Sequence, residues 1–227
     1  MATNLKGFDK LCDGGLLNNA SYLVSGNAGT GKSLFCLEFM HNALKNGEKC
    51  IYISFEENLE DLRNDGAKIG LDFSKYEEKE QMKFAYYFPY EVTNFDIKLV
   101  NEITTMGATR IVIDSSSAMV MGLEDEFEVR KELYSLVSLL KKLNCTGLIT
   151  SEIPGISDHD CGELSRFGVE EFVVDGAIKF YISAGERYAR ITKMRSTDHE
   201  KMPVQFKITN SGFEFLSKIQ KSELKKR

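Results

Sequence analysis

Hydrophobic and polar positions follow two different periods along the chain. Between about residues 20 and 152, short apolar runs alternate with segments whose apolar residues recur every three or four positions, which is typical of βαβ units on a parallel sheet. From residue 176 onward the period changes to two, with turn sequences at Ala184-Gly185 and Asn210-Ser211-Gly212. We therefore expect an α/β fold whose mainly parallel central sheet is flanked by helices and extended by antiparallel C-terminal hairpins.

The same pattern predicts the individual elements. Strands are expected at residues 22–24, 49–55, 83–88, 110–114, 145–150, 177–183, 187–194, 204–209 and 213–216. Helices are expected at residues 33–46, 58–69, 95–106 and 126–144, with Asn58 as the N-cap of the second and Gly107 ending the third. We expect one domain over residues 1–217 and a charged, flexible tail over residues 218–227.

Composition narrows the class of protein. The chain has 227 residues, 42% of them hydrophobic, and a formal net charge of −5. This balance predicts a globular protein and argues against nucleic acid or an anionic membrane as the main partner. No segment resembles a signal peptide or a membrane span, so we expect no membrane insertion and a cytoplasmic location. Cysteines at 36, 50 and 145 lie in apolar patterns and predict buried free thiols, while the three histidines are too scattered for a metal cluster.

Residues 26–33 carry the most specific motif. They read Gly26, Asn27, Ala28, Gly29, Thr30, Gly31, Lys32 and Ser33, a complete GxxxxGK[ST] loop between a predicted strand and a predicted helix. In such a loop backbone N–H groups surround phosphate oxygens, the lysine reaches the β and γ phosphates, and the Ser33 hydroxyl holds Mg²⁺. A plain strand-to-helix turn would not need three residue types at fixed spacing. The motif therefore predicts a nucleoside triphosphate site.

Three acidic residues follow strands of the same sheet and are candidates for chemistry. Asp114 ends an apolar strand at the edge where ligands bind, so we expect it to orient Mg²⁺ beside Ser33; its alternative role is the N-cap of the next helix. Glu56 and Glu57 follow the strand after the loop helix and can both reach the site only if that strand has already ended. We expect Glu56 to orient or deprotonate the attacking water and Glu57 to support it; the alternative is a pair of exposed acids.

The stretch Thr150-Ser151-Glu152 ends the predicted strand after the long helix. Polar residues at that place can sense a γ-phosphate, but the stretch could equally start a simple turn. Both interpretations stay open at this point.

Several motifs together resemble the family of the circadian clock protein KaiC. They are residues 26–33, Phe55-Glu56-Glu57, residues 110–118, residues 167–175, and Lys193-Met194-Arg195 followed by His199. The resemblance covers nearly the whole chain and is closest to a single KaiC domain of the ATPase type. It implies a RecA-like, ring-forming ATPase, and because many single-domain relatives are archaeal, we expect an archaeal source.

The resemblance also implies roles residue by residue. Thr30 to Ser33 and Leu34 match the segment that holds the phosphates and Mg²⁺, and Glu56 and Glu57 match paired catalytic glutamates. The predicted strand that ends at Met194 and the loop after it match a segment that, in the family, reaches the nucleotide of a neighbouring subunit. The matching residues are Lys193, Met194, Arg195, Thr197 and His199. Arg195 would then stabilise transition-state charge in a hexamer with ATP at each subunit interface. From spacing alone, Lys193 and Arg195 would be an exposed strand face.

Other functions of this superfamily remain as alternatives. A self-phosphorylating kinase is disfavoured because residues 153–166 offer only the separated Ser157 and Ser165. Strong nucleic-acid binding is disfavoured because the expected channel segments, residues 121–128 and 157–163, are acidic, although a RecA- or RadA-type regulator of recombination remains an alternative. The third alternative is a nucleotide-gated interaction protein that has little turnover and binds an unidentified protein partner.

Overall fold

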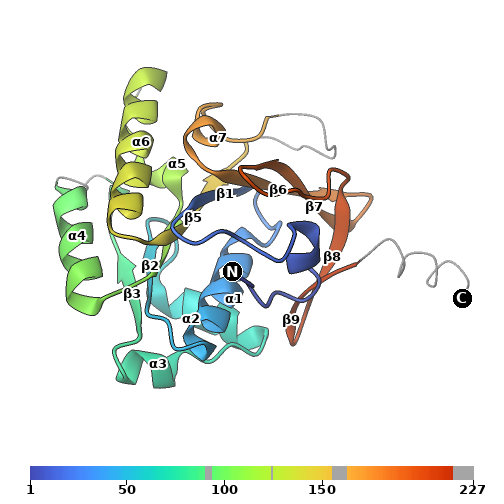
Figure 1. Cartoon of the computed structure of the whole chain (residues 1–227), viewed down its shortest axis with the longest axis horizontal. Helices are drawn as coiled ribbons and strands as arrows, with labels where there is room; N and C mark the ends of the chain where they lie inside the picture. The colour runs from blue at the N-terminus through green and yellow to red at the C-terminus, as the bar shows by residue number, and fades with distance from the viewer. Residues whose placement is uncertain (90–93, 124, 155–162, 217–227) are drawn as a thin grey trace, which may run out of the picture.

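The computed structural model describes residues 1–89, 94–123, 125–154 and 163–216 (Figure 1). In these residues nine strands form one sheet in the order β3-β2-β4-β5-β1-β6-β7-β8-β9. The strands are β1 (Ser21–Gly26), β2 (Cys50–Ser54), β3 (Met82–Tyr86), β4 (Arg110–Asp114), β5 (Thr146–Glu152), β6 (Gly176–Ser183), β7 (Glu186–Met194), β8 (Val204–Thr209) and β9 (Gly212–Phe215).

The pairing of the strands divides the sheet into two parts. From β3 to β6 every neighbouring pair is parallel, whereas β6-β7, β7-β8 and β8-β9 pair antiparallel. The expected fold class, a mainly parallel sheet with antiparallel C-terminal strands, is confirmed. Because the parallel strands point the same way, the residues that follow β1, β2, β4 and β5 meet at one edge of the sheet.

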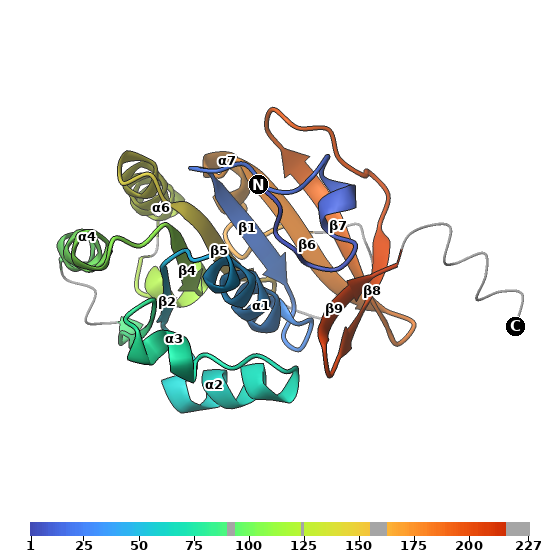
Figure 2. The ribbon, with the colours of Figure 1, turned by 60° about the horizontal axis from the view of Figure 1, so that its bottom comes forward.

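Helices cover both faces of this sheet (Figure 2). The helices are η1 (Asp9–Leu11), α1 (Lys32–Lys45), α2 (Leu59–Lys68), α3 (Ser74–Glu78), α4 (Phe95–Met106), α5 (Ser116–Met119), α6 (Glu126–Lys142) and α7 (Glu170–Val173). One apolar core lies between the sheet and α1 to α3 and includes side chains of β8 and β9. The second core lies between the sheet and α4, α5 and α6. None of the described helices is both long and apolar enough to cross a membrane.

Helix ends follow their sequence signals. The Asn58 side chain accepts hydrogen bonds from the amides of Glu60 and Asp61, as expected for an N-cap. Gly107 ends α4 in the left-handed region with φ 68°. Helix α6 begins at the cap Asp125 and carries Lys141 and Lys142 in its last turn, where they complement the helix dipole.

The structure corrects several element boundaries. Strand β5 extends to Glu152, two residues beyond its expected end, so Thr150 and Ser151 belong to the strand and do not begin a turn. The short helices η1, α3, α5 and α7 have too few residues to show a helical period, so the hydrophobic pattern did not predict them. Cysteines 12, 36, 50 and 145 are buried free thiols, which confirms that prediction for three of them. The expected tail, residues 218–227, lies outside the described residues.

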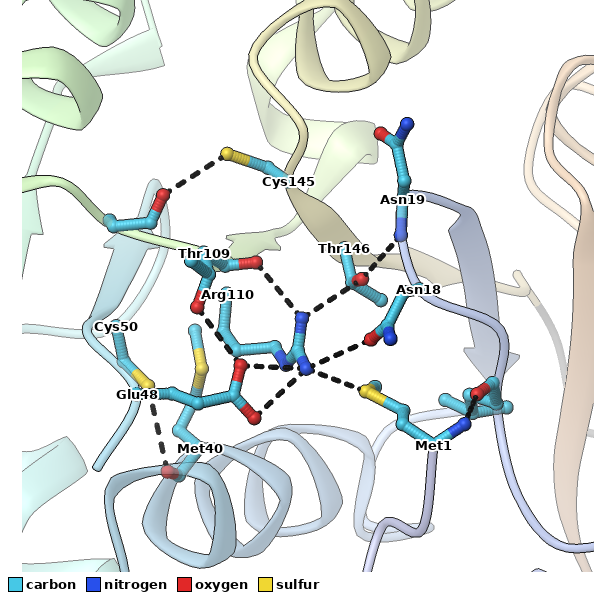
Figure 3. A network of polar contacts seen from close by, with 12 residues as sticks. Met1, Asn18, Asn19, Met40, Glu48, Cys50, Thr109, Arg110, Cys145 and Thr146 are labelled. Carbon is cyan, nitrogen blue, oxygen red and sulfur yellow. Dashed lines mark hydrogen bonds and ion pairs between the residues drawn. The ribbon is translucent and has the colours of Figure 1, made fainter. Parts of the chain in front are cut away.

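A buried charge network closes the edge of the sheet where the parallel strands begin (Figure 3). The Arg110 guanidinium lies 2.6 Å from a Glu48 carboxylate oxygen. It also donates to the Thr146 hydroxyl at 3.0 Å and to the Asn18 side-chain oxygen at 3.2 Å. The Thr109 hydroxyl donates to Glu48 at 3.0 Å. This network links β4, β5 and the N-terminal segment by charge-assisted hydrogen bonds.

Candidate nucleotide-binding site

The phosphate loop connects the end of β1 to the start of α1. Gly26 and Gly31 have φ values of 155° and 102°, which side chains rarely allow. A Cβ on Gly31 would lie 2.8 Å from Cδ1 of Ile208, and one on Gly26 would collide with the Phe180 carbonyl. The backbone conformation therefore favours glycine at both positions, and at Gly26 the close approach of the β6 backbone requires it as well.

Hydrogen bonds within the loop hold its shape. The Lys32 ammonium donates to the carbonyls of Gly26 at 2.9 Å and Asn27 at 3.1 Å. The Thr30 hydroxyl donates to the Asn27 carbonyl at 2.8 Å, and the Asn27 amide donates to the Ile153 carbonyl at 3.0 Å. The loop is thus folded around its own lysine and fastened to the end of β5, a form suited to surround an anion.

A cavity of about 250 Å³ opens beside this loop. It is lined by Ala28, Gly29, Gly31, Lys32, Ser33, Leu34, Glu56, Glu57, Asp65, Asp114, Glu152, Arg187 and Ile208. The predicted loop residues, both glutamates and Asp114 therefore come together around one space. Five carboxylates and two cationic side chains lie in this lining, so its side chains carry more negative than positive groups, which favours a divalent cation.

Asp114 is buried at the end of β4 and faces this cavity. Its two carboxylate oxygens accept hydrogen bonds from the hydroxyls of Tyr52 and Thr150. Burial and the neighbouring Asp114 raise the pKa of Tyr52 well above its usual value, so this hydroxyl stays protonated and donates. The N-cap of α5 is Ser115, whose side chain accepts from the Ala118 amide. The capping alternative for Asp114 is therefore wrong.

Glu56 and Glu57 follow β2 directly, and the strand has ended at Ser54 as their joint role requires. The Ser115 hydroxyl donates to Oε1 of Glu56. Partial desolvation raises the pKa of the Glu56 carboxyl, and the charge of Glu152 adds to this rise, while the hydrogen bond from Ser115 opposes it. Desolvation and the charge of Asp114 also raise the pKa of Glu57. Both side chains are exposed, yet they line the cavity, so a carboxylate with raised basicity faces the place where water could attack.

The residues at the end of β5 divide into two roles. Thr150 and Ser151 are buried, and Thr150 acts on the site through its hydrogen bond to Asp114. Only Glu152 of the three lines the cavity. Glu152 therefore places one more carboxylate beside the loop, and the γ-phosphate-sensor role of this stretch stays a prediction.

Arg187 is a site residue that the sequence analysis missed. It lies near the start of β7, and its guanidinium reaches the Gly29 carbonyl of the phosphate loop at 3.5 Å. Arg187, Arg190 and Lys193 all stand in one strand of mixed polar and apolar residues. Nothing in that pattern indicates which cation faces the loop; only the pairing of β7 with β6 beside β1 decides it.

The fold and the phosphate loop are shared with a known protein family. The family model described as "ATPase: KaiC" matches residues 1–220. The chain belongs to the KaiC ATPase family. This places it in the RecA superfamily and confirms the resemblance seen in the sequence.

Relatives of the KaiC family cover the chain almost completely. The circadian clock protein KaiC3 of Synechocystis is 32% identical over 225 residues, which are 92% of this chain and 44% of the relative. The clock oscillator protein KaiC of a Nostoc species is 36% identical, over 92% of this chain and 43% of the relative. A crystal structure of the KaiC-like protein PH0186 from Pyrococcus horikoshii superposes with a TM-score of 0.85 at 32% identity, covering 96% of this chain and 98% of the other. The chain thus spans less than half the length of these two clock proteins.

The KaiC resemblance implies that one segment reaches the nucleotide bound by a neighbouring subunit. In the structure this segment does not line the cavity of its own chain. Within the described residues, the cavity lining includes none of the five that were assigned to it: Lys193, Met194, Arg195, Thr197 and His199. The Lys193 ammonium donates to the carbonyls of Glu171 and Val174 at 2.7 Å each. The Arg195 side chain is 54% exposed and lies 3.7 Å from Asp175. These residues therefore do not complete the site within one chain.

The residues present fit a triphosphate with Mg²⁺. The described residues contain no group of three or more His, Cys, Asp or Glu placed to hold a metal by themselves. A P-loop site does not need one, because phosphate oxygens and water supply most ligands of Mg²⁺. Ser33 and the buried Asp114 both line the cavity, and the two side chains that donate hydrogen bonds to the Asp114 carboxylate are neutral hydroxyls.

Proposed function

We propose that this protein is a Mg²⁺-dependent ATPase that converts ATP and water to ADP and phosphate, in a homo-oligomeric ring with ATP at the subunit interfaces. One observation carries the proposal: Lys32, Ser33, Asp114 and Glu56 converge on one cavity at the end of the parallel strands. We further propose that residues 1–217 form a single ATPase domain, and that the enzyme acts in the cytoplasm as a signalling or regulatory ATPase with a protein partner and no strong affinity for nucleic acid.

Each residue around the cavity has a role in this mechanism. The loop amides and Lys32 bind the phosphates, and Ser33 and Asp114 hold Mg²⁺, which when bound neutralises developing negative charge. Glu56 orients the attacking water and accepts its proton at a carboxylate oxygen, and the Ser115 hydroxyl fixes that carboxylate. Glu57 supports the charge of Glu56. Arg187 holds the loop in shape from the same chain.

Arg195 supplies the last cation from the neighbouring subunit in this proposal. Its side chain is half exposed and lies away from the cavity of its own chain, which supports a role in trans. An arginine that enters a phosphoryl-transfer site from a neighbour raises turnover by about 10³-fold or more. The most economical closed assembly for such head-to-tail contacts is a ring, and the KaiC family membership makes a hexamer the form we propose.

Autophosphorylation is not part of the proposal. Of the two serines between residues 153 and 166, Ser157 lies outside the described residues. The Ser165 side chain is buried, and its hydroxyl donates to Glu171 at 2.6 Å. A hydroxyl held in this way is a poor phosphate acceptor.

Phosphate release and ATP-dependent oligomerisation, measured side by side, test the proposal. Glu56→Gln should keep ATP binding and lower turnover by about 10²-fold or more, whereas Glu60→Gln, a nearby exposed glutamate on α2, should leave it unchanged. Arg195→Ala should also lower turnover, and mixing the Arg195→Ala and Glu56→Gln proteins should restore part of it. Unchanged turnover in Glu56→Gln would contradict the catalytic assignment, and absence of restoration on mixing would contradict the action in trans.

A further inference from the structure

The segment that carries Arg195 is anchored to the body of the subunit at Asp175, a residue with an 11% exposed side chain between α7 and β6. The Ser21 amide donates to Oδ2 of Asp175 at 3.0 Å, and the Asp175 amide donates to the Ser21 carbonyl at 2.8 Å. The Arg195 amide donates to the Asp175 carbonyl at 2.8 Å. The place of this carboxylate is thus set by β1, independently of the Arg195 side chain.

Two cations approach the same oxygen of Asp175. The Lys141 ammonium, from the last turn of α6, donates to Oδ1 at 2.8 Å. The Arg195 guanidinium lies 3.7 Å from the same Oδ1, and its side chain is about half exposed. The short contact is therefore with Lys141, and the arginine is only loosely associated.

We propose that Lys141 is a positioning residue for Arg195: by neutralising Asp175, it keeps the arginine free to enter the nucleotide site of the neighbouring subunit. This inference rests on the proposed function, because it takes Arg195 to act in trans. It adds a positioning contact, on α6, to a site whose other residues lie at the end of the parallel strands.

The physical reason is the cost of leaving a buried carboxylate without a cation. A mostly buried charge needs a partner, and removal of one partner is strongly unfavourable. Without Lys141, Asp175 would draw in Arg195, whose planar guanidinium can bind a carboxylate through two parallel hydrogen bonds. Lys193 is less suited to replace Lys141, since its ammonium already donates to two carbonyls. When Arg195 is held on its own subunit, it cannot enter the nucleotide site of the neighbouring subunit.

The experiment compares three variants of α6 in the full chain. Lys141→Met should lower kcat about tenfold, because most arginines would be captured, and should change KM for ATP little. Lys141→Arg, which keeps the cation, should retain turnover. Lys142→Met, in the same helical turn but exposed, is the matched control and should leave turnover unchanged. Unchanged kcat in Lys141→Met would overturn the inference.

Two further measurements separate positioning from a merely structural role. Mixing Lys141→Met with Glu56→Gln subunits should restore turnover, because an intact site then receives a free arginine from its neighbour. Adding Asp175→Asn to Lys141→Met should also restore it, because the neutral amide cannot capture Arg195 but can still accept from the Ser21 amide. Loss of kcat that neither mixing nor Asp175→Asn restores would overturn the inference.

The failure of the proposed function gives a different result. If Arg195→Ala alone left turnover unchanged, the action of Arg195 in trans would be wrong, and the role of Lys141 would fall with it. If Arg195→Ala lowered turnover while Lys141→Met did not, only the role of Lys141 would be wrong.

Discussion

The two ends of β4 carry opposite charges, and these charges have different kinds of hydrogen-bonding partner. Arg110 begins the strand and Asp114 ends it, and they are 6% and 5% exposed. Arg110 has a carboxylate, Glu48, at 2.6 Å, with further hydrogen bonds around it. Asp114 receives its hydrogen bonds from two neutral hydroxyls and faces a cavity. The Arg110 charge is thus neutralised by a carboxylate of the same chain, whereas the Asp114 carboxylate accepts hydrogen bonds from neutral hydroxyls.

This difference distinguishes a charge that is paired within the fold from one that is available to a ligand in the cavity. A buried charge paired with its opposite joins elements of the fold and leaves little affinity for a ligand. A buried carboxylate whose hydrogen-bond donors are neutral hydroxyls can attract a cation from the cavity. The kind of partner, more than burial, therefore tells the two ends of one strand apart.

The largest expected effect is at the carboxyl end of the strand. Asp114→Asn removes the charge but keeps the shape, since the hydroxyls of Tyr52 and Thr150 can rotate to pair with an amide. We expect turnover to fall by about a thousandfold, because several kcal/mol of metal-dependent stabilisation is lost, with little change in melting temperature. Phosphate release and calorimetry measure both quantities. Asp65→Asn, another carboxylate in the cavity lining, should have a much smaller effect; equal losses would contradict the distinct role of Asp114.

At the other end of β4 the expected effect is on stability. Arg110→Met leaves Glu48 unpaired and should lower the free energy of unfolding by about 3 kcal/mol, while the folded fraction keeps its kcat. Urea unfolding measures the change. Arg63→Met removes a partly exposed pair with Glu77, in which the arginine side chain is 40% exposed compared with 7% for Arg110, and should cost only about 1 kcal/mol. If Arg110→Met were as mild as Arg63→Met, the network would not be structural.

The smallest expected effect is a shift of the pH profile. Glu56 must be ionised to accept a proton, so kcat falls as the pH drops through its raised pKa. Glu152→Gln removes a negative charge that raises this pKa, and the acid limb should move to lower pH. Ser115→Ala removes a hydrogen bond that lowers the pKa, and the limb should move to higher pH. Profiles of kcat at saturating Mg-ATP test the opposite signs; movement in the same direction would reject Glu56 as the titrating base.

The fold could be predicted from the sequence wherever a local pattern determines it. Strand β4 has the expected bounds because a run of apolar residues stands between two charges, and α4 has them because its period ends at Gly107. Helix α5 was missed because four residues that begin with two serines have no detectable period. The end of β5 was missed because Ser151 is polar yet buried by its place in the sheet.

The candidate site could likewise be predicted from the sequence only where a local motif marks its residues. The loop, Glu56, Glu57 and Asp114 have local motifs, and the structure brings them together. Arg187 and Glu152 reach the cavity only through strand pairing, and the approach of Lys141 to Asp175 joins residues 34 positions apart. Such contacts depend on tertiary structure, which a single sequence does not display. The trans role of Arg195 and the hexamer stay predictions.

Strand β7 has a consequence for how the protein should behave on dilution. Arg187 near its start reaches the phosphate loop of its own chain, and Arg195 follows its end. Seven residues stand between them, and eight extended residue-to-residue steps span about 26 Å, so one chain cannot bring both arginines to one nucleotide. Turnover should therefore be of higher than first order in protein concentration wherever subunits dissociate, and specific activity should decline with dilution while ATP binding to each chain persists.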